Sequence, residues 1–401
     1  MNTHPPINPY DLIVIGAGVS GLSLASRAVH TGRSVLVLEA ENRVGGCIES
    51  WRPFSDFAVE LGAHTAYNSY GALLTELEAR AGLSGLLPRE KAGYFFMEQG
   101  RAVSPVRRLS FLSLFFYLPL GILRDKAKAR VGDYYRRLFG AGNYQRLLAP
   151  AFAAVLSQPA EDYPAAWLFR KKPRVKTAPR KYSHAGGLQG LAEAMTTGLE
   201  VRTGTPVLGI ARTDAGYVVK TADGELTCRK LALATPADVT AQLLAKAHPD
   251  IAAPLAKIEM ADIETLAVVV RRDAVHLPKL AGLIGDTEPW FSAVSRDPLP
   301  HPDLRGFTFH FRPGRLDAAQ KRAAVAQVLG VSEDAFVAVT EKTNRLPRLT
   351  LEHVALAAHI DAQTRDQPLA LLGNYLNGLS IGDCAERAQR EAERLLALMA
   401  A

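Results

Sequence analysis

Three glycines near the amino terminus have the spacing of a phosphate-binding turn. Gly16, Gly18 and Gly21 fit the pattern G-x-G-x-x-G. In such a turn the first glycine allows a tight bend, the second lets backbone approach a pyrophosphate, and the third lets a helix pack closely on a strand. Helix N-terminal N–H groups favour phosphate charge, so Val19 and Ser20 are also candidate cofactor contacts. The alternative is a small-residue turn that binds nothing.

An acidic residue follows this turn at the distance expected for a ribose contact. Glu39 lies 18 residues after Gly21, and a separation of about 20 residues is typical. A carboxylate there, with Ala40 beside it, would bind ribose hydroxyls and disfavour the 2′-phosphate of NADP. The alternative is a solvated glutamate at a strand end.

Regular elements with the right periodicity surround these residues. Apolar runs at 12–15 and 34–38 predict buried parallel strands, with a helix over 19–31 between them. Further helices are expected at 69–82, 144–157 and 317–329. Short strands are expected at 201–203, 205–212, 216–221 and 230–234.

The carboxyl-terminal segment repeats the order of strand, glycine-rich loop and helix. A strand at 369–372 leads to Gly373 and Asn374, and then to Gly382 and Asp383. Asp383 is the expected N-cap of a helix that starts at Cys384. The glycines would allow close approach to a flat ring, and the helix start would favour negative charge on it. The alternative is a capped terminal helix that binds nothing.

With these motifs in view, the chain resembles the flavin amine oxidase superfamily. The resemblance rests on the first glycine turn, the Arg-x-Gly-Gly element at Arg43, Gly45 and Gly46, and the Glu-x-Gly element at Glu60, Gly62 and Ala63. A glycine-rich surface turn at 43–46 and a plain surface carboxylate at Glu60 are the alternatives. The terminal motif, from Gly373 to Cys384, is most similar to that of protoporphyrinogen oxidases.

The resemblance implies an α/β fold in which a Rossmann-like FAD-binding domain, of the kind with two dinucleotide-binding motifs, is interleaved with an α+β substrate domain. FAD-binding segments are expected at 8–85, 183–250 and 351–401. Residues 86–182 are expected to form a helical region that could face a membrane, and residues 251–350 are expected to form the substrate domain. It also implies that the backbone of Val207 binds adenine and that Ala234 lies at the cofactor. FAD is expected to be non-covalent.

The implied reaction is hydride transfer to FAD from a carbon next to, or conjugated with, nitrogen, with O₂ or a quinone as electron acceptor. Protoporphyrinogen IX is the expected small-molecule substrate. One alternative is an amine oxidase or desaturase with a smaller substrate, which the change of a family Tyr and Gly to Leu349 and Glu352 favours. Another is a non-catalytic relative, such as the Rab escort proteins. The sequence indicates no catalytic acid or base.

Composition narrows the class of protein further. The 401 residues are 48% hydrophobic and 22% charged, which indicates a globular protein with a large core. A net charge of +7 suits anionic substrates or a membrane surface. Neither a nucleic-acid motif nor a metal-binding H-E-x-x-H occurs. Three scattered cysteines and an amino terminus unlike a signal peptide predict a cytoplasmic protein, with peripheral contact to the inner membrane face as one option.

Two basic stretches leave alternatives open. The apolar residues 109–123 are bracketed by arginines and lysines. They are too few to span a bilayer, and could lie in its interface or form a buried helix pair broken at Pro119. The basic residues 170–181 could attract a carboxylated substrate, or form a solvated loop. Candidate partners for substrate carboxylates are Arg107, Arg108, Arg174 and Lys176.

Overall fold

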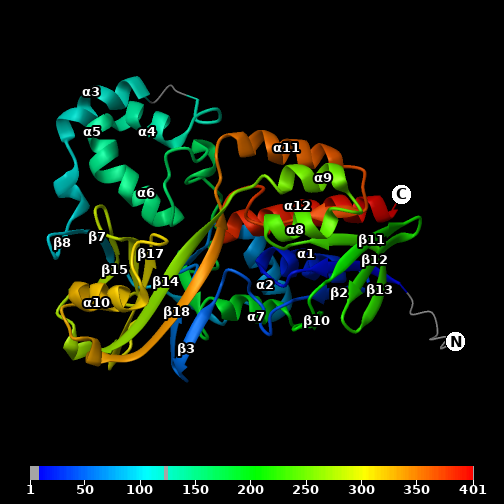
Figure 1. Cartoon of the computed structure of the whole chain (residues 1–401), viewed down its shortest axis with the longest axis horizontal. Coiled ribbons are helices and arrows are strands. Elements are labelled where there is room, and N and C mark those ends of the chain that lie inside the picture. The colour runs from blue at the N-terminus through cyan, green and yellow to red at the C-terminus, as the bar shows by residue number, and fades with distance from the viewer. Residues whose placement is uncertain (1–8, 122–124, 401) are drawn as a thin grey trace.

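The computed structural model describes residues 9–121 and 125–400. Figure 1 shows an elongated molecule with two lobes, each built around a sheet, and both chain ends lie in the same lobe. Two long strands run along the other lobe toward the first, and a group of helices lies above it. The resemblance predicted this mixed α/β architecture.

The first sheet is built around a strand that is buried on both faces. β1 (Tyr10–Ile15) pairs in parallel with β2 (Val35–Leu38) and with β13 (Gly224–Leu233). β10 (Glu200–Arg202) extends the sheet beyond β2, and β19 (Leu369–Leu371) pairs in parallel with the end of β13. Five parallel strands from distant parts of the chain therefore end at one edge.

Alternate residues of β1 belong to different hydrophobic cores, as expected for a strand covered on both sides. One core packs the sheet against a layer of four helices, α1 (Val19–His30), α2 (Gly71–Ala81), α7 (Gln189–Met195) and α12 (Ile381–Ala400). The other core lies under α8 (Ala237–Leu244), α9 (Pro249–Leu255) and α11 (Glu352–Thr364).

An antiparallel extension completes the first sheet. β11 (Gly209–Thr213) and β12 (Gly216–Thr221) form a hairpin on the first half of β13. The strand predicted at 205–212 is therefore wrong in its first half. The N–H groups of Gly204 and Thr205 instead donate to the carbonyls of Glu41 and Glu39, which ties this stretch to the loop after β2.

The second sheet has seven strands and lies in the lobe that contains most of the residues 251–350. Its order is β18 (Phe336–Pro347), β14 (Met260–Arg271), β17 (Leu304–Phe311), β16 (Trp290–Ser295), β15 (Leu280–Ile284), β7 (Gly93–Glu98) and β8 (Arg101–Val103). α10 (Ala318–Leu329) packs on one face through Val325 and Leu329. β7 and β8 come from the part of the sequence expected to be helical, and β7 joins the sheet by parallel pairing with β15.

Small strands connect the two lobes. The hairpin of β3 (Ser50–Phe54) and β4 (Phe57–Glu60) packs its apolar side against Ala267 and Val269 of the second sheet. β5 (Ala66–Tyr67) and β6 (Leu86–Pro88) both pair with β9 (Lys181–His184). These contacts place residues 60–67 and 86–89 between the two sheets.

A helical group covers residues 111–156. It comprises α3 (Phe111–Gly121), α4 (Val131–Phe139), α5 (Ala141–Asn143), the π-helical turn η2 (Tyr144–Leu148) and α6 (Ala149–Leu156). The helix predicted at 144–157 thus starts with a π turn, and Pro150 lies just after that turn, in the first turn of α6. α3 continues through Pro119, contrary to the predicted break.

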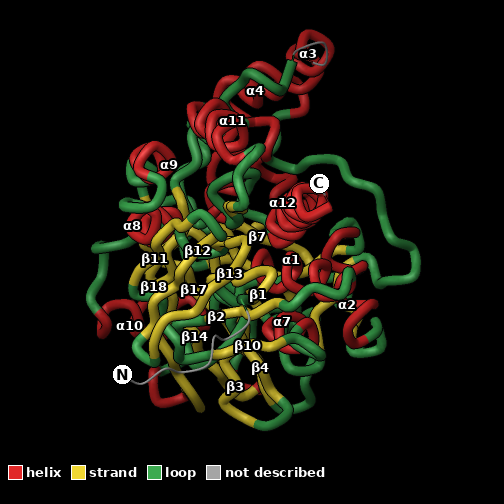
Figure 2. The backbone as a smooth tube through the Cα atoms, turned by 90° about the vertical axis from the view of Figure 1, so that its right-hand side faces the viewer, coloured by secondary structure: helices red, strands yellow, loops and turns green. Residues whose placement is uncertain are grey.

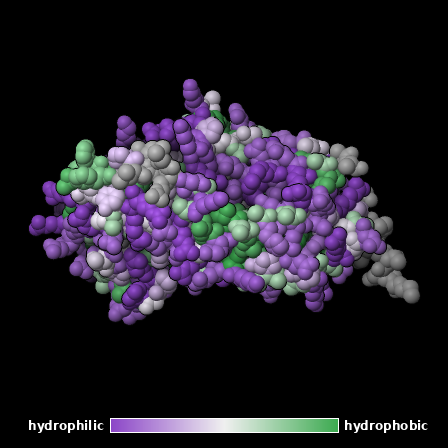
Figure 3. All heavy atoms as spheres, turned by 90° about the horizontal axis from the view of Figure 1, so that it is seen from above, coloured by the Kyte–Doolittle hydropathy of each residue, from purple (hydrophilic) through white to green (hydrophobic). Residues whose placement is uncertain are grey.

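The apolar face of α3 is open rather than buried. Phe111, Leu112, Phe115 and Phe116 are each at least 60% exposed. Figure 2 shows α3 at the outer tip of the molecule, away from both sheets, and Figure 3 shows a hydrophobic area at that end. The predicted buried helix pair is therefore wrong for these residues, while residues 122–124 lie outside the described part of the chain. No described helix meets the length and apolarity needed to cross a bilayer.

Candidate cofactor cradle and substrate cavity

Four of the predicted segments meet at the carboxyl edge of the first sheet. Gly16 follows β1, Glu39 follows β2 and Ala234 follows β13 directly, and Gly373 comes two residues after the end of β19. Three backbone hydrogen bonds fix their register: Gly16 N to Leu38 O (2.7 Å), Ala234 N to Ile15 O (2.7 Å) and Leu372 N to Leu233 O (2.8 Å). Ligands of open parallel sheets bind at this edge.

The three glycines of the first turn have different structural roles. Gly16 has φ of 103°, and a Cβ on Gly21 would lie 2.0 Å from the Gly16 carbonyl oxygen, so α1 can approach the strand only with glycine there. A Cβ on Gly18, in contrast, would meet no atom closer than 4.0 Å. The space beside Gly18 is therefore open, as a bound pyrophosphate requires.

The start of α1 offers free donors to that space. Gly18 is the N-cap and supplies no side-chain acceptor, and the first turn of the helix holds no acidic residue. Val19 and Ser20 are buried within this turn. Uncapped N–H groups and the helix dipole together favour an anion at this end.

The Glu39 carboxylate is held at the turn by backbone donors. Its Oε2 accepts from the Ala17 N–H at 2.7 Å, and its Oε1 accepts from the Glu41 N–H at 3.0 Å. Glu39 is half-buried and Ala40 is exposed beside it. The hydrogen bond from Thr205 N to Glu39 O brings the half-buried Val207 toward the same edge.

The Arg-x-Gly-Gly element lies directly against the first turn. Gly45 N donates to Ala17 O at 2.9 Å, and Gly45 pairs with Gly18 as an isolated parallel bridge. A Cβ on Gly46 would lie 3.4 Å from the Gly18 Cα. The Arg43 side chain folds over this loop, and its Nη2 lies 2.8 Å from an oxygen of the Glu41 carboxylate and 2.8 Å from one of the Glu49 carboxylate. The glycines thus extend the open face of the cradle.

The Glu-x-Gly element packs on the same loop. A Cβ on Gly62 would lie 2.1 Å from the Cys47 carbonyl oxygen, and Leu61 N donates to Glu49 O at 2.8 Å. Ala63 and Gly62 are half-buried at this contact. These residues and Arg43–Gly46, which are separate in the sequence, therefore form one surface.

Glu60 is buried, so its interpretation as a surface carboxylate is wrong. Its Oε1 accepts from Leu188 N at 2.8 Å, and its Oε2 is 2.6 Å from Ser50 Oγ. Burial raises the pKa of the Glu60 carboxyl to about 7, against which these two hydrogen bonds act. Glu60 therefore fastens β3 and β4 to the loop before α7.

The carboxyl-terminal loop meets the cradle, but its helix starts earlier than predicted. α12 begins at Ile381, so Asp383 is its third residue and Ser380 is the cap. Asp383 N donates to Ser380 Oγ at 3.0 Å, and Ser380 N donates to Asp383 Oδ2 at 3.3 Å. This reciprocal pair is a capping box with aspartate in place of glutamate. A Cβ on Gly382 would lie 2.3 Å from the Tyr70 ring.

Asp383 also binds two cations from the basic stretch 170–181. Lys172 Nζ lies 2.8 Å from Asp383 Oδ1, and the Arg170 guanidinium pairs with the same oxygen. Arg170 also donates to the Asn377 carbonyl at 2.5 Å. Arg170 and Lys172 are therefore not solvated loop residues, since they fix the loop that carries Asn374 and Gly373.

Comparisons with known proteins agree with this geometry. The family model described as flavin containing amine oxidoreductase matches residues 19–396. This chain belongs to that family. FAD is accordingly the cofactor, and the uncapped start of α1, the open space at Gly18 and the Glu39 carboxylate fit its pyrophosphate and ribose.

Individual relatives cover different parts of the chain. A protein named possible lysine-specific histone demethylase 1, from Drosophila melanogaster, is 37% identical over 92 residues, which are 23% of this chain and 10% of that protein. A candidate protoporphyrinogen oxidase from Exiguobacterium sp. 255-15 has a solved structure with a TM-score of 0.74 and 19% identity, covering 95% of this chain and 97% of that one. The structure of wild-type putrescine oxidase bound to putrescine has a TM-score of 0.72 and 16% identity. The match covers 98% of this chain and 100% of that one. The structures share the fold.

Cys384 lies in the cradle of this flavoprotein as a protonated thiol. Burial raises the pKa of Cys384 to about 12, and the neighbouring Asp383 carboxylate acts in the same direction, against a hydrogen bond with Ser20. A thiolate is the reactive form of cysteine. The environment of Cys384 is therefore unsuited to covalent attachment of the flavin.

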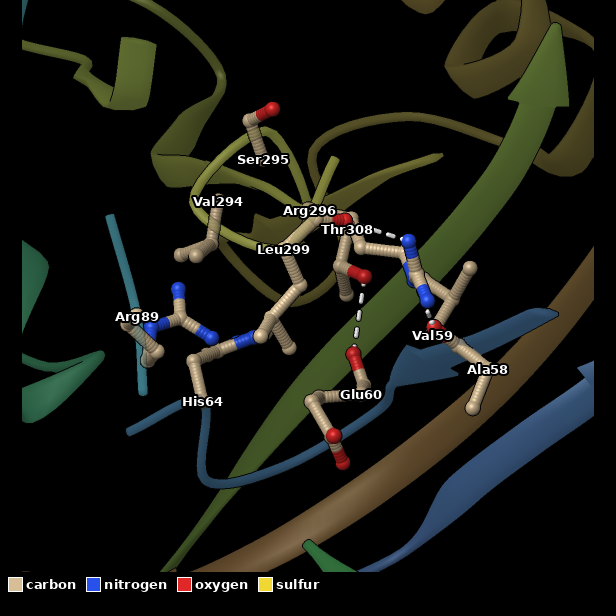
Figure 4. A pocket seen from close by; sticks show the side chains of 10 residues that line it. All are labelled: Ala58, Val59, Glu60, His64, Arg89, Val294, Ser295, Arg296, Leu299 and Thr308. Carbon is tan, nitrogen blue, oxygen red and sulfur yellow. Dashed lines mark hydrogen bonds between the residues drawn. The ribbon is translucent and has the colours of Figure 1, made fainter. Parts of the chain in front are cut away.

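A small cavity of about 20 Å³ lies beyond Gly62 and Ala63, between the hairpin β3–β4 and the substrate sheet. Figure 4 shows its lining, which the sequence did not indicate, apart from Glu60: Ala58, Val59, Glu60, His64, Arg89, Val294, Ser295, Arg296, Leu299 and Thr308. Thr308 Oγ1 donates to the Glu60 carbonyl at 2.8 Å and joins the two walls. The Glu60 carboxylate itself turns away, toward Ser50.

Two histidines meet beside this cavity. His64 Nε2 lies 2.7 Å from His310 Nε2, so one ring must donate and the other accept. Burial lowers the pKa of His310 to about 4. Burial also lowers the pKa of His64 well below its ordinary value, and the His310 ring and Arg89 act in the same direction. Both imidazoles are therefore neutral at pH 7.

Proposed function

We propose that this flavoprotein takes a hydride from a carbon conjugated with nitrogen, and that its substrate is protoporphyrinogen IX. The observation that carries the proposal is the neutral imidazole pair of His64 and His310, because His64 directly follows the Glu60–Ala63 element expected at the flavin. Hydride removal from a methylene carbon that bridges two electron-rich pyrroles needs no ionised base at that carbon, because a pyrrole N–H proton can leave to solvent. Support for the porphyrinogen comes from the terminal Gly373–Cys384 motif and the full-length likeness to the candidate protoporphyrinogen oxidase.

The chain's own residues hold the cofactor and exclude competing chemistry. FAD accepts the hydride when it is bound, and O₂ or a quinone is the proposed final acceptor. Gly18 and the start of α1 receive the pyrophosphate, Glu39 receives the ribose, and the loop of Gly373 and Asn374 approaches the flavin. Cys384 stays a thiol, so the proposed attachment is non-covalent.

Hydrogen bonding supports one tautomer for His64. Asn344 Nδ2 donates to Thr265 Oγ1 at 3.2 Å, and Thr265 Oγ1 lies 3.1 Å from His310 Nδ1. If the Thr265 hydroxyl donates to His310 Nδ1, then His310 Nε2–H donates to His64 Nε2. His64 is left with its proton on Nδ1, where it can donate to a substrate or cofactor acceptor.

An anaerobic mixing experiment tests the proposed substrate. The purified flavin-loaded protein is mixed with protoporphyrinogen IX while the visible band of oxidised flavin and porphyrin fluorescence are followed. Bleaching of the flavin together with the appearance of porphyrin supports the proposal. A flavin that stays oxidised contradicts it. Dithionite in a parallel sample shows that the flavin is reducible.

A smaller amine is the second candidate substrate. Leu349 is buried and Glu352 pairs with Arg130 on the surface, so the two residues that depart from the family pattern have structural roles here. The likeness to putrescine oxidase extends over the whole chain. Putrescine in the same anaerobic assay distinguishes the two, since a flavin that putrescine alone reduces favours the amine. Tightly bound FAD that no donor reduces favours a non-catalytic relative.

We also propose that α3 meets an anionic membrane surface. Its exposed apolar side chains are accompanied by Arg107, which is exposed, and by Lys128 on the following segment. Such a helix can lie in the interface with basic residues toward lipid phosphate. Flotation with vesicles that contain phosphatidylglycerol, compared with phosphatidylcholine alone, tests this. Replacing Phe115 and Phe116 by serine should abolish flotation while FAD content stays unchanged.

A further inference from the structure

Arg89 is a half-buried cation whose charge is favoured by the Glu60 carboxyl, although the two groups form no ion pair. Its backbone N–H donates to the Lys181 carbonyl at 3.0 Å, which fixes the end of β6. Among the described residues its guanidinium makes no hydrogen bond and no ion pair, and burial lowers its pKa below the ordinary arginine value. Partial burial of a charge is costly, so an arginine that lines a cavity without a hydrogen-bond partner is suited to an anionic ligand.

Neighbouring arginines show what compensation looks like in this part of the fold. Arg296 lines the same cavity and donates to the Ala58 carbonyl at 2.8 Å and to the Leu299 carbonyl. Arg305, which is fully buried, pairs with Asp297 at 2.5 Å. Arg89 has neither kind of partner, although it is as close to the cavity as Arg296.

The guanidinium of Arg89 points into the cavity from the same side as His64. Figure 4 shows both groups directed into the space framed by Val294 and Leu299. His64 comes two residues after Gly62, which packs on the cradle loop. Arg89 therefore lies on the substrate side of the FAD-binding segment.

Two tyrosines supply further donors near Arg89. Tyr67 and Tyr94 are near enough to Arg89 to influence its pKa, and their side chains are 36% and 43% exposed. Burial raises the pKa of both hydroxyls, which keeps them protonated at pH 7. One cation flanked by two hydroxyl donors is suited to an acidic group.

We infer that Arg89 anchors a carboxylate of the substrate, with the Tyr67 and Tyr94 hydroxyls beside it. A planar carboxylate matches the guanidinium fork. The cavity beside Arg89 is small, about 20 Å³, so the anchored group would be a small terminal group of the substrate. The inference rests on the proposed function, since the propionates of a porphyrinogen are such groups, and it moves this role from the basic stretches to Arg89.

Binding of a simple carboxylate tests the anchor without turnover. The flavin-loaded protein is titrated with benzoate, and with benzamide as the neutral analogue, by calorimetry. Arg89→Met should weaken benzoate binding at least tenfold, the order expected for a lost hydrogen bond to a charged group, and should leave benzamide unchanged. The matched control is Arg101→Met, at an exposed arginine of β8 with no ion pair among the described residues. Equal benzoate affinity in wild type and Arg89→Met overturns the inference.

A second variant protects the test against misfolding. Arg89→Lys keeps the charge and loses the fork, so benzoate should bind with intermediate affinity. FAD content equal to that of wild type confirms that each variant is folded. If Arg101→Met weakens benzoate binding as much as Arg89→Met does, the loss comes from the lower net positive charge of the protein, and the anchor is refuted.

Turnover separates this inference from the proposed function. With protoporphyrinogen IX, Arg89→Met should raise KM at least tenfold and change kcat little, while the dimethyl ester should serve both proteins equally. If porphyrinogen does not reduce the flavin but benzoate binding still depends on Arg89, the anchor stands and the proposed substrate fails. If porphyrinogen reduces the flavin and Arg89→Met changes neither KM nor benzoate binding, the anchor fails alone.

Discussion

Replacement of Glu60 by glutamine should stabilise the protein at pH 8 and have little effect at pH 5. Burial raises the pKa of this carboxyl from 4.5 to about 7 in the folded protein. The folded state therefore binds the proton more tightly than the unfolded state, and the free energy of unfolding falls as pH rises from 4.5 through 7. One pKa unit corresponds to about 1.4 kcal/mol, so the ionised carboxylate costs about 3 kcal/mol above pH 7.

Glutamine at position 60 reproduces the protonated carboxyl. Its carbonyl can accept from Leu188 N and its amide can donate to Ser50 Oγ, at the positions of the present oxygens. Urea unfolding at saturating FAD, at pH 5 and pH 8, measures the difference, because the midpoint and slope give the free energy of unfolding. We expect a gain of about 3 kcal/mol at pH 8 and of less than about 1 kcal/mol at pH 5.

The outcome at the two pH values decides the reasoning. An equal gain at both would show that the benefit of glutamine does not come from removal of a charge. A loss at pH 8 would show that the Glu60 carboxylate is stabilised where it lies. Glu78→Gln, at an exposed carboxylate of α2, is the matched control and should change neither value.

Three other substitutions test the cofactor cradle. Gly21→Ala should abolish FAD binding, since the new Cβ would lie 2.0 Å from a backbone oxygen. The control Gly209→Ala, which has open space around the new Cβ, should bind FAD normally. The flavin absorbance of the purified proteins measures both outcomes. Arg170→Met should weaken FAD binding by roughly tenfold, because the Asp383 carboxylate would lose one of the two cations, Arg170 and Lys172, that hold the loop in place. Fluorescence titration of the apoprotein with FAD measures the affinity. Cys384→Ser should retain FAD, and acid precipitation should release all flavin from variant and wild type alike; flavin in the wild-type pellet alone would show a covalent bond.

The cofactor cradle could be predicted from the sequence because it consists mainly of backbone. The spacing of Gly16, Gly18 and Gly21 predicts the local backbone geometry of the turn. The apolar runs before Gly16, Glu39 and Gly373 predict buried parallel strands. Parallel strands that share a sheet end at a common edge, so local patterns suffice to bring distant segments together.

The ion pairs around Asp383 could not be predicted in the same way. Arg170 lies 213 residues before Asp383 in the sequence, and a run of basic residues next to prolines usually marks a solvated loop. The helix start was misplaced by three residues because Ser380 and Asp383 both suit a cap, and only the reciprocal hydrogen bonds show which residue has that role. Long-range pairing of charges leaves no periodic signal.

The substrate side of the molecule depends on such long-range contacts throughout. The cavity is walled by β4, β16 and β17, which are far apart in the chain, and Arg89 reaches it from a loop without any motif. In such a fold, glycines shape the cofactor site and separate side chains shape the proposed substrate site. Substitutions of those side chains can therefore change the substrate while the cofactor stays the same. Relatives as different as a candidate protoporphyrinogen oxidase and putrescine oxidase share this backbone. The charge at Arg89, rather than the family motifs, therefore discriminates an acidic substrate from a cationic amine, which the unpaired guanidinium would repel.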